Sequence, residues 1–139
     1  MNFYVDTCIY LNLWKKETRQ GKPFWKYAND FFEKVKVSKN IVYYSGFVLK
    51  ELTYKLTEEE FKEKTRLFRS KNYKRIFPSD KDLKLASKIE SMTKFEISYY
   101  DILHFILSKN TNAILVTRDK KLIRFARKNF VNAKRPEEL

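Results

Sequence analysis

Glycine and proline are scarce in this sequence of 139 residues, which contains two glycines and three prolines. Phosphate-binding loops need several closely spaced glycines, because backbone amides approach the phosphates closely there. The sequence therefore excludes a P-loop and a dinucleotide-binding fingerprint. It also has no repeat, no low-complexity tract and no linker rich in glycine or proline, so we expect one domain over residues 1–139.

Cysteine and histidine are equally scarce, with one residue of each, Cys8 and His104. A single cysteine excludes an intrachain disulfide and a four-cysteine zinc site, and it is typical of a reducing compartment. Long apolar runs are also missing, because Asp6 interrupts the segment MNFYVDTCIYLNLW, which is too short to cross a bilayer. We therefore expect a soluble, cytoplasmic protein that has no contact with the membrane.

Positive charge, in contrast, is abundant. The chain has 30 lysines and arginines against 17 acidic residues, a formal charge of +13 and a pI of about 9.7. This surplus predicts an anionic partner, because the surface potential concentrates phosphates near the protein. Nucleic acid is the favoured partner, but an acidic protein, an anionic membrane or the lysine-rich surface of a heat-adapted protein would fit the same composition.

Strand-like and helix-like apolar patterns alternate along the chain. This order predicts an α/β fold, with a mostly parallel sheet of four or five strands and helices on both faces. The run 113–117 (AILVT) is typical of a strand buried on both faces. The expected strands are 2–5, 41–44, 73–77, 113–117 and 130–133, and the expected helices are 7–16, 23–37, 45–55, 57–70, 79–92, 98–109 and 119–128.

Two acidic residues follow expected strands. Asp6 comes directly after the first strand, and Asp119 follows the strand AILVT after one intervening residue. In parallel α/β sheets ligands bind beyond the carboxyl ends of the strands, so both carboxylates are candidates for a site. Each acid also precedes a helix, and helix capping would explain either of them taken alone.

Two further acids, Glu51 and Asp101, lie beside the apolar stripes of their helices. Glu51 comes one turn after Phe47, and Asp101 comes one turn before Phe105. A buried carboxylate is costly unless it is paired, so an ion pair or partial exposure would be needed in the absence of a metal. If the four acids converge, Mg²⁺ or Mn²⁺ would neutralise them and activate water against a phosphodiester.

Two other residues near these acids have simpler explanations. His104 lies one helical turn after Asp101 and could donate a hydrogen bond to the site, although a lone half-buried histidine is more often structural. Cys8 lies in an apolar helix and is expected to be a small core residue.

The residues after Asp6 exclude two other α/β classes. A receiver-type phosphorylation domain needs paired acids after its first strand, and a dehalogenase-type phosphatase needs a second aspartate two positions after the first. Positions 7 and 8 are Thr7 and Cys8.

The motifs around the four acids resemble the PIN-domain family, and most of all its small VapC-type toxin ribonucleases. The resemblance rests on YVDTCIYLNL, on an acid in the helix after the second strand, and on YYDILHFILSKNTNAILVTRDKKL. It covers nearly the whole chain in the order and spacing of the elements. It implies a three-layer α/β/α fold in which the catalytic acids and metal ligands are Asp6, Glu51, Asp101 and Asp119.

The function that this resemblance implies is an endoribonuclease using one or two Mg²⁺ or Mn²⁺ ions. In toxin members it also implies a homodimer and a VapB-type antitoxin that blocks the site. Thr117 is expected to hydrogen-bond within the acidic cluster, and Thr7 to bind phosphate or place a ligand. Two alternatives stay open, a non-catalytic RNA-binding PIN fold and a nuclease that cuts DNA by the same chemistry.

Two basic clusters, within residues 62–75 and 118–135, are candidates for contacts with RNA phosphates. A solvated basic face would give the same pattern. The residues we expect to bind RNA are Arg66 and Arg69 in the first cluster and Arg118, Lys120 and Lys121 in the second.

Overall fold

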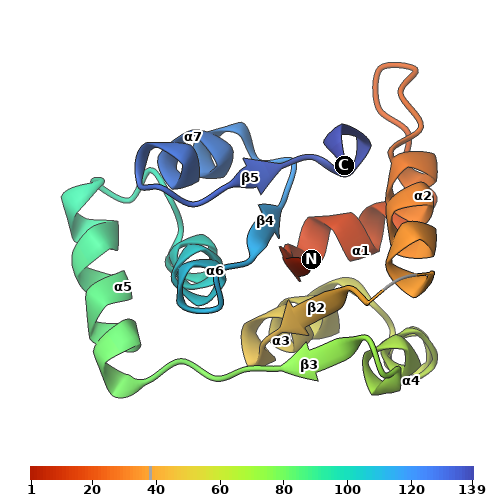
Figure 1. Cartoon of the computed structure of the whole chain (residues 1–139), viewed down its shortest axis with the longest axis horizontal. Helices are drawn as coiled ribbons and strands as arrows, with labels where there is room; N and C mark the ends of the chain where they lie inside the picture. Colours follow the sequence, from red (N-terminus) through yellow and green to blue (C-terminus); the bar gives the residue numbers. More distant parts are fainter. Residues whose placement is uncertain (38) are drawn as a thin grey trace.

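The centre of the fold is a sheet of five parallel strands in the order β3-β2-β1-β4-β5 (Figure 1). The structure is a computed structural model, and it describes residues 1–37 and 39–139. In the central strand, Phe3 is in register with Val42 on one side and with Ile114 on the other. The strands are β1 (Asn2–Val5), β2 (Ile41–Tyr44), β3 (Tyr73–Arg75), β4 (Ile114–Val116) and β5 (Ala133–Lys134).

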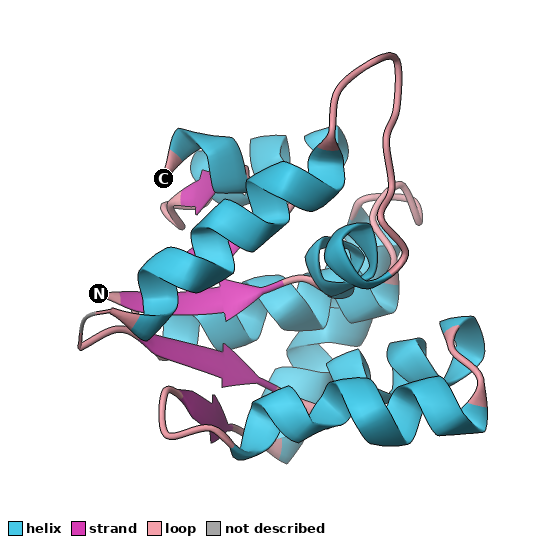
Figure 2. Ribbon diagram, turned by 90° about the vertical axis from the view of Figure 1, so that its right-hand side faces the viewer, coloured by secondary structure: helices cyan, strands magenta, loops and turns pink. Residues whose placement is uncertain are grey.

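Helices lie on both sides of this sheet and complete three layers (Figure 2), as the sequence predicted. Helix α1 packs against α2 and α3, whereas α6 packs against β1 and β4. Among the described residues, no helix is both long enough and apolar enough to span a membrane. The helices are α1 (Thr7–Trp14), α2 (Phe24–Lys36), α3 (Gly46–Lys55), α4 (Glu58–Lys64), α5 (Asp80–Met92), α6 (Tyr99–Asn110) and α7 (Lys120–Lys128), with short 3-10 helices at Thr65–Arg69 and Pro136–Glu138.

The strand order reverses beside β1, which creates the place where a site can form. From β1 the chain adds β2 and β3 on one side, and it then returns to add β4 and β5 on the other. The carboxyl ends of β1 and β4 therefore adjoin at a topological switch point, where parallel sheets bind ligands. Val5, Leu115 and Val116 are fully buried there, as the apolar run AILVT predicted.

The elements expected over 57–70 and 130–133 differ most from the structure, while the helix expected over 7–16 and the strand expected over 73–77 each end two residues earlier than expected. The helix expected over 57–70 ends at Lys64 and continues as a 3-10 helix, because the Thr65 hydroxyl bonds to the Phe61 carbonyl and competes with the helical pattern. The strand expected over 130–133 begins only at Ala133. Phe130, with a φ of 66°, follows the last turn of α7 in the left-handed conformation that ends helices, so it cannot be part of a strand.

Candidate active site

The four acids line a single cavity of about 440 Å³ at the switch point. They come from four different elements, since Asp6 follows β1, Glu51 lies on α3, Asp101 lies on α6, and Asp119 precedes α7. The structure thus brings together residues that are up to 113 positions apart, from 6 to 119. The same cavity is also lined by Thr7, Cys8, Leu11, Lys55 and Arg118.

Asp6 occupies the N-cap position of α1, but its carboxylate does not cap that helix. The buried hydroxyl of Thr117 instead donates to Asp6 Oδ2 over 2.7 Å. The Cys8 thiol donates weakly to the same oxygen over 3.6 Å. Helix capping therefore does not explain this buried acid. Cys8 packs against the core, as expected, but it is only partly buried and also lines the cavity.

Asp119 both caps α7 and lines the cavity. One of its oxygens, Oδ1, accepts from the backbone amides of Lys121 at 2.9 Å and Leu122 at 3.2 Å. Its own amide donates to the Thr117 hydroxyl over 3.2 Å. Because that hydroxyl also donates to Asp6, Thr117 links the two acids that follow β1 and β4.

Glu51 is held by two donors that share one of its oxygens. Thr7 Oγ1 lies 2.9 Å from Glu51 Oε1, and His104 Nε2 lies 2.8 Å from the same atom. The Glu51 side chain retains 29% exposure, so it reaches the open part of the cavity while one oxygen is anchored.

Asp101 contributes from α6 and is half-buried. It lies in the first turn of α6, where its amide donates to the capping hydroxyl of Ser98. Burial, together with the negative charges of Asp6 and Asp119, raises the pKa of Asp101 to about 7, against the lowering effects of His104 and Ser98. A carboxylate in such surroundings is stabilised by a nearby cation.

Behind the acids lies a buried chain of hydrogen bonds through His104, which the sequence marked as a candidate donor to the site, whereas the parts of Tyr4 and Ser45 in it were not expected. Tyr4 OH is 2.7 Å from His104 Nδ1 and 2.7 Å from Ser45 Oγ, and all three side chains have no exposed surface. Ser45 occupies the N-cap position of α3, but its hydroxyl bonds to Tyr4 instead of capping the helix. Burial alone would lower the pKa of His104, but the bond to Glu51 and the neighbouring carboxylates outweigh it and raise the pKa.

The donor set fits a divalent cation. One ligand atom from each of Asp6, Glu51 and His104 lies within 4.8 Å of the others, and carboxylate oxygens are the ligands that Mg²⁺ and Mn²⁺ prefer. His104 does not line the cavity and both of its ring nitrogens are hydrogen-bonded, so the cavity itself presents carboxylates. Asp101 and Asp119 complete this acidic wall.

The basic residues expected to bind RNA lie in three different settings. Arg118 lines the cavity, but its guanidinium makes a two-point pair with Glu137 at 2.8 and 2.9 Å, bonds to Asn12, and lies 3.9 Å above the Phe24 ring. Lys120 and Lys121 are exposed in the first turn of α7. Arg66 and Arg69 are exposed on the first 3-10 helix and do not line the cavity.

Lys55 is a cation of the cavity that the sequence analysis missed. It is the last residue of α3 and follows Glu51 by four positions, so the two side chains share one face of the helix. That spacing was the available signal. It carried no weight on its own, because most lysines of such a basic chain lie on the surface.

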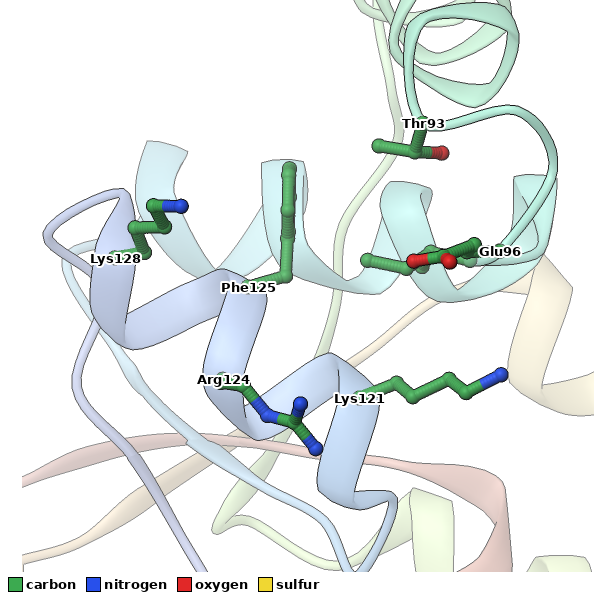
Figure 3. A pocket seen from close by; sticks show the side chains of 7 residues that line it. Thr93, Glu96, Lys121, Arg124, Phe125 and Lys128 are labelled. Atoms are coloured by element: carbon green, nitrogen blue, oxygen red, sulfur yellow. The ribbon is translucent and has the colours of Figure 1, made fainter.

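A second, smaller cavity of about 170 Å³ adjoins α7 (Figure 3). Lys121, Arg124 and Lys128 contribute from α7 and are exposed, and Thr93 and Glu96 contribute from the segment between α5 and α6. Three cations against one acid give this hollow a positive charge, on the same helix whose N-cap is Asp119.

The comparison with protein families identifies the family to which this fold belongs. The family described as the PIN domain matches residues 3–128, and the chain therefore belongs to the PIN-domain family. This membership confirms the family resemblance seen in the sequence. PIN domains are generally nucleases that use divalent metals.

Two solved structures share the fold over nearly their whole length. The crystal structure of VapBC2 from Rickettsia felis, bound to a DNA fragment from their promoter, aligns with a TM-score of 0.68 and 22% identity over 97% of this chain and 98% of that chain. The crystal structure of FitAcB from Neisseria gonorrhoeae aligns with a TM-score of 0.63 and 12% identity over 100% of both chains. A search of curated proteins found no match.

Proposed function

We propose that this protein is a metal-dependent endoribonuclease and the toxin of a toxin–antitoxin pair. The observation that carries the proposal is the convergence of Asp6, Glu51, Asp101 and Asp119 around one cavity at the switch point of a parallel sheet. Membership of a family of nucleases supports the class of reaction, hydrolysis of a phosphodiester.

The four carboxylates would hold one or two Mg²⁺ or Mn²⁺ ions. When bound, such a metal lowers the pKa of a bound water and neutralises charge on the phosphate that is cut. The raised pKa of Asp101 supports this assignment, because it reflects first the burial of the carboxyl and then the negative charges of Asp6 and Asp119, and a bound cation would offset both.

The other residues of the cavity have separate tasks in this proposal. Thr117 and Thr7 each donate to one oxygen of an acid, which orients Asp6 and Glu51 and leaves the second oxygen of each for the metal. Lys55 supplies positive charge in the cavity wall, where it offsets the repulsion between the acids and an RNA phosphate.

Basic residues on α7 are proposed to carry the RNA strand away from the cavity. From Lys121 to Lys128 the helix rises about 10.5 Å, which matches the length of about three nucleotides in a stacked strand. Lys120 lies beside this path, and Arg66 and Arg69 would act as more distant phosphate contacts. Arg118 is paired with Glu137, so an RNA phosphate would have to replace that carboxylate.

The proposed partners are a VapB-type antitoxin and a second copy of the chain. Both come from the resemblance of the sequence to VapC-type toxins, and the fold shared with VapBC2 of Rickettsia felis supports the antitoxin. The proposed location is the cytoplasm, where RNA is available.

The substrate is tested by incubating the purified protein and Mn²⁺ with single-stranded RNA and DNA of the same base sequence. Cleavage of RNA by wild type, and its loss in Glu51→Gln, is the expected result. Cleavage of DNA alone would assign the same site to a DNA nuclease. Binding of RNA without cleavage, with affinity falling steeply as salt rises, would make the protein a binding module.

A further inference from the structure

We infer that His104 is a positioning residue that holds Glu51 in the orientation a metal needs, with Tyr4 supporting it from behind. The inference rests on the proposed function, because it assigns a task within the proposed metal site. Its core observation is a continuous chain of contacts, in which Ser45 meets Tyr4, Tyr4 meets His104, and His104 meets Glu51, each over 2.7 to 2.8 Å.

The location of His104 argues for support and against direct contact with a ligand. Its side chain has no exposed surface and is not part of the cavity wall, whereas Glu51, which it contacts, is 29% exposed and lines the cavity. Both ring nitrogens are engaged, Nδ1 by Tyr4 and Nε2 by Glu51. Buried partners of this kind commonly orient the carboxylate and histidine ligands of metal sites.

Glu51 needs such support more than the three aspartates do. Its side chain has one more rotatable bond, and the charge of Asp6 pushes it away from the cluster. The imidazole lies between these two acids, 2.8 Å from Glu51 Oε1 and 3.8 Å from Asp6 Oδ1. A donor at this position draws Glu51 toward Asp6, against the repulsion between them.

The chain of hydrogen bonds fixes the orientation of the Glu51 side chain relative to the surrounding strands and helices. Ser45 begins α3 and Glu51 lies on the same helix, while Tyr4 belongs to β1 and His104 to α6. The contacts therefore tie three elements together around the site. Tyr4 fixes the imidazole ring, since it occupies the nitrogen that faces away from Glu51.

The inference is tested by measuring Mn²⁺ affinity by calorimetry in wild type and four variants. His104→Leu removes the donor and is expected to weaken Mn²⁺ binding by about 10- to 100-fold. His104→Gln retains an amide N–H that can reach Glu51 and is expected to restore most of the affinity. Tyr4→Phe removes only the support of the ring and is expected to weaken binding by about fivefold.

Tyr10→Phe, the fourth variant, is the matched control for Tyr4→Phe. Tyr10 is also fully buried, and among the described residues its hydroxyl has no hydrogen-bond partner. Removing that hydroxyl should leave Mn²⁺ affinity unchanged. A thermal melt of each variant separates a fall in affinity from unfolding.

Two results would overturn the inference while leaving the metal site intact. One is a folded His104→Leu that binds Mn²⁺ as tightly as wild type. If His104→Leu fails to fold, equal changes in Mn²⁺ affinity in Tyr4→Phe and Tyr10→Phe would overturn the inference in the same way. The other is hyperfine coupling to nitrogen in the electron paramagnetic resonance spectrum of bound Mn²⁺, which would show that His104 is itself a ligand. If wild type itself binds no Mn²⁺, the proposed function fails and the inference fails with it.

Discussion

Replacing Asp101 by asparagine should stabilise the metal-free protein while abolishing its proposed activity. Asparagine has nearly the same shape but no charge, so it removes both the cost of burying a carboxylate and the repulsion from Asp6 and Asp119. The amide of residue 101 would still donate to Ser98, because that bond belongs to the backbone. The change therefore measures the net cost of a negative charge at position 101.

The size of the effect follows from the pKa of Asp101, which rises from 3.8 to about 7 in the folded protein. Between these two values the folded state binds a proton that the unfolded state has released, so wild-type stability falls as pH rises. The difference corresponds to at most about 4 kcal/mol above pH 7 and under about 1 kcal/mol at pH 4. For a chain of this length, each kcal/mol shifts Tm by about 4 °C.

The assay is thermal and urea unfolding in EDTA at pH 4, 6 and 8. Asp82→Asn is the matched control, because Asp82 occupies the same position in α5, three residues after a capping serine. Burial by itself raises the pKa of Asp82, but the bonds from Ser79 and Asn110 and the charge of Lys81 together outweigh it and lower the pKa. Its replacement should reduce stability at pH 8, and that effect should disappear as pH falls through the lowered pKa.

If metal-free Asp101→Asn is no more stable than wild type at pH 8, the charge of Asp101 does not destabilise the folded protein. A gain of the same size at pH 4 and pH 8 would also contradict the prediction, since the gain would then have no connection with ionisation of this carboxylate.

Three further results are expected. Thr117→Val should lower the free energy of unfolding, measured in urea, by about 1 to 3 kcal/mol, because it removes the donor to the buried carboxylate of Asp6. An unchanged free energy of unfolding would show that this hydrogen bond does not contribute to stability. Changing Lys121 and Arg124 to serine should make the affinity for single-stranded RNA less dependent on salt. The slope of log affinity against log salt concentration should fall by about 0.7 for each phosphate that is no longer neutralised. An unchanged slope would show that RNA does not bind along α7. Cys8 should react slowly with iodoacetamide at pH 8, because burial and Asp6 raise the pKa of its thiol, and fast labelling would contradict that.

Much of the fold could be predicted because its signals are local. The run AILVT forms the interior strand β4, and the spacing of Thr57 and Glu60 forms the capping box that starts α4. The acids at strand ends were also visible, since Asp6 and Asp119 closely follow strands. Their proximity depends on pairing of β1 with β4, which places Val5 opposite Val116.

The details of the site could not be predicted, because they depend on contacts between distant residues. Tyr4 and His104 are 100 positions apart, and only the folded chain places the tyrosine hydroxyl against the imidazole. Similarly, Arg118 stands next to Asp119 in sequence and was expected to bind RNA, but Glu137, close to the end of the sequence, pairs with it. Composition gives the number of charges and does not show which of them are paired.

The first experiment to make asks whether the four acids form the metal site of a ribonuclease. It measures cleavage of a mixed RNA pool by wild type, Asp101→Asn and Asp82→Asn, each with Mn²⁺, Mg²⁺ or EDTA. If the proposed site is correct, wild type and Asp82→Asn should cleave RNA in the presence of metal. Asp101→Asn should not cleave it, and no protein should cleave it in EDTA. Cleavage by folded Asp101→Asn, or cleavage that persists in EDTA, would contradict the proposed site.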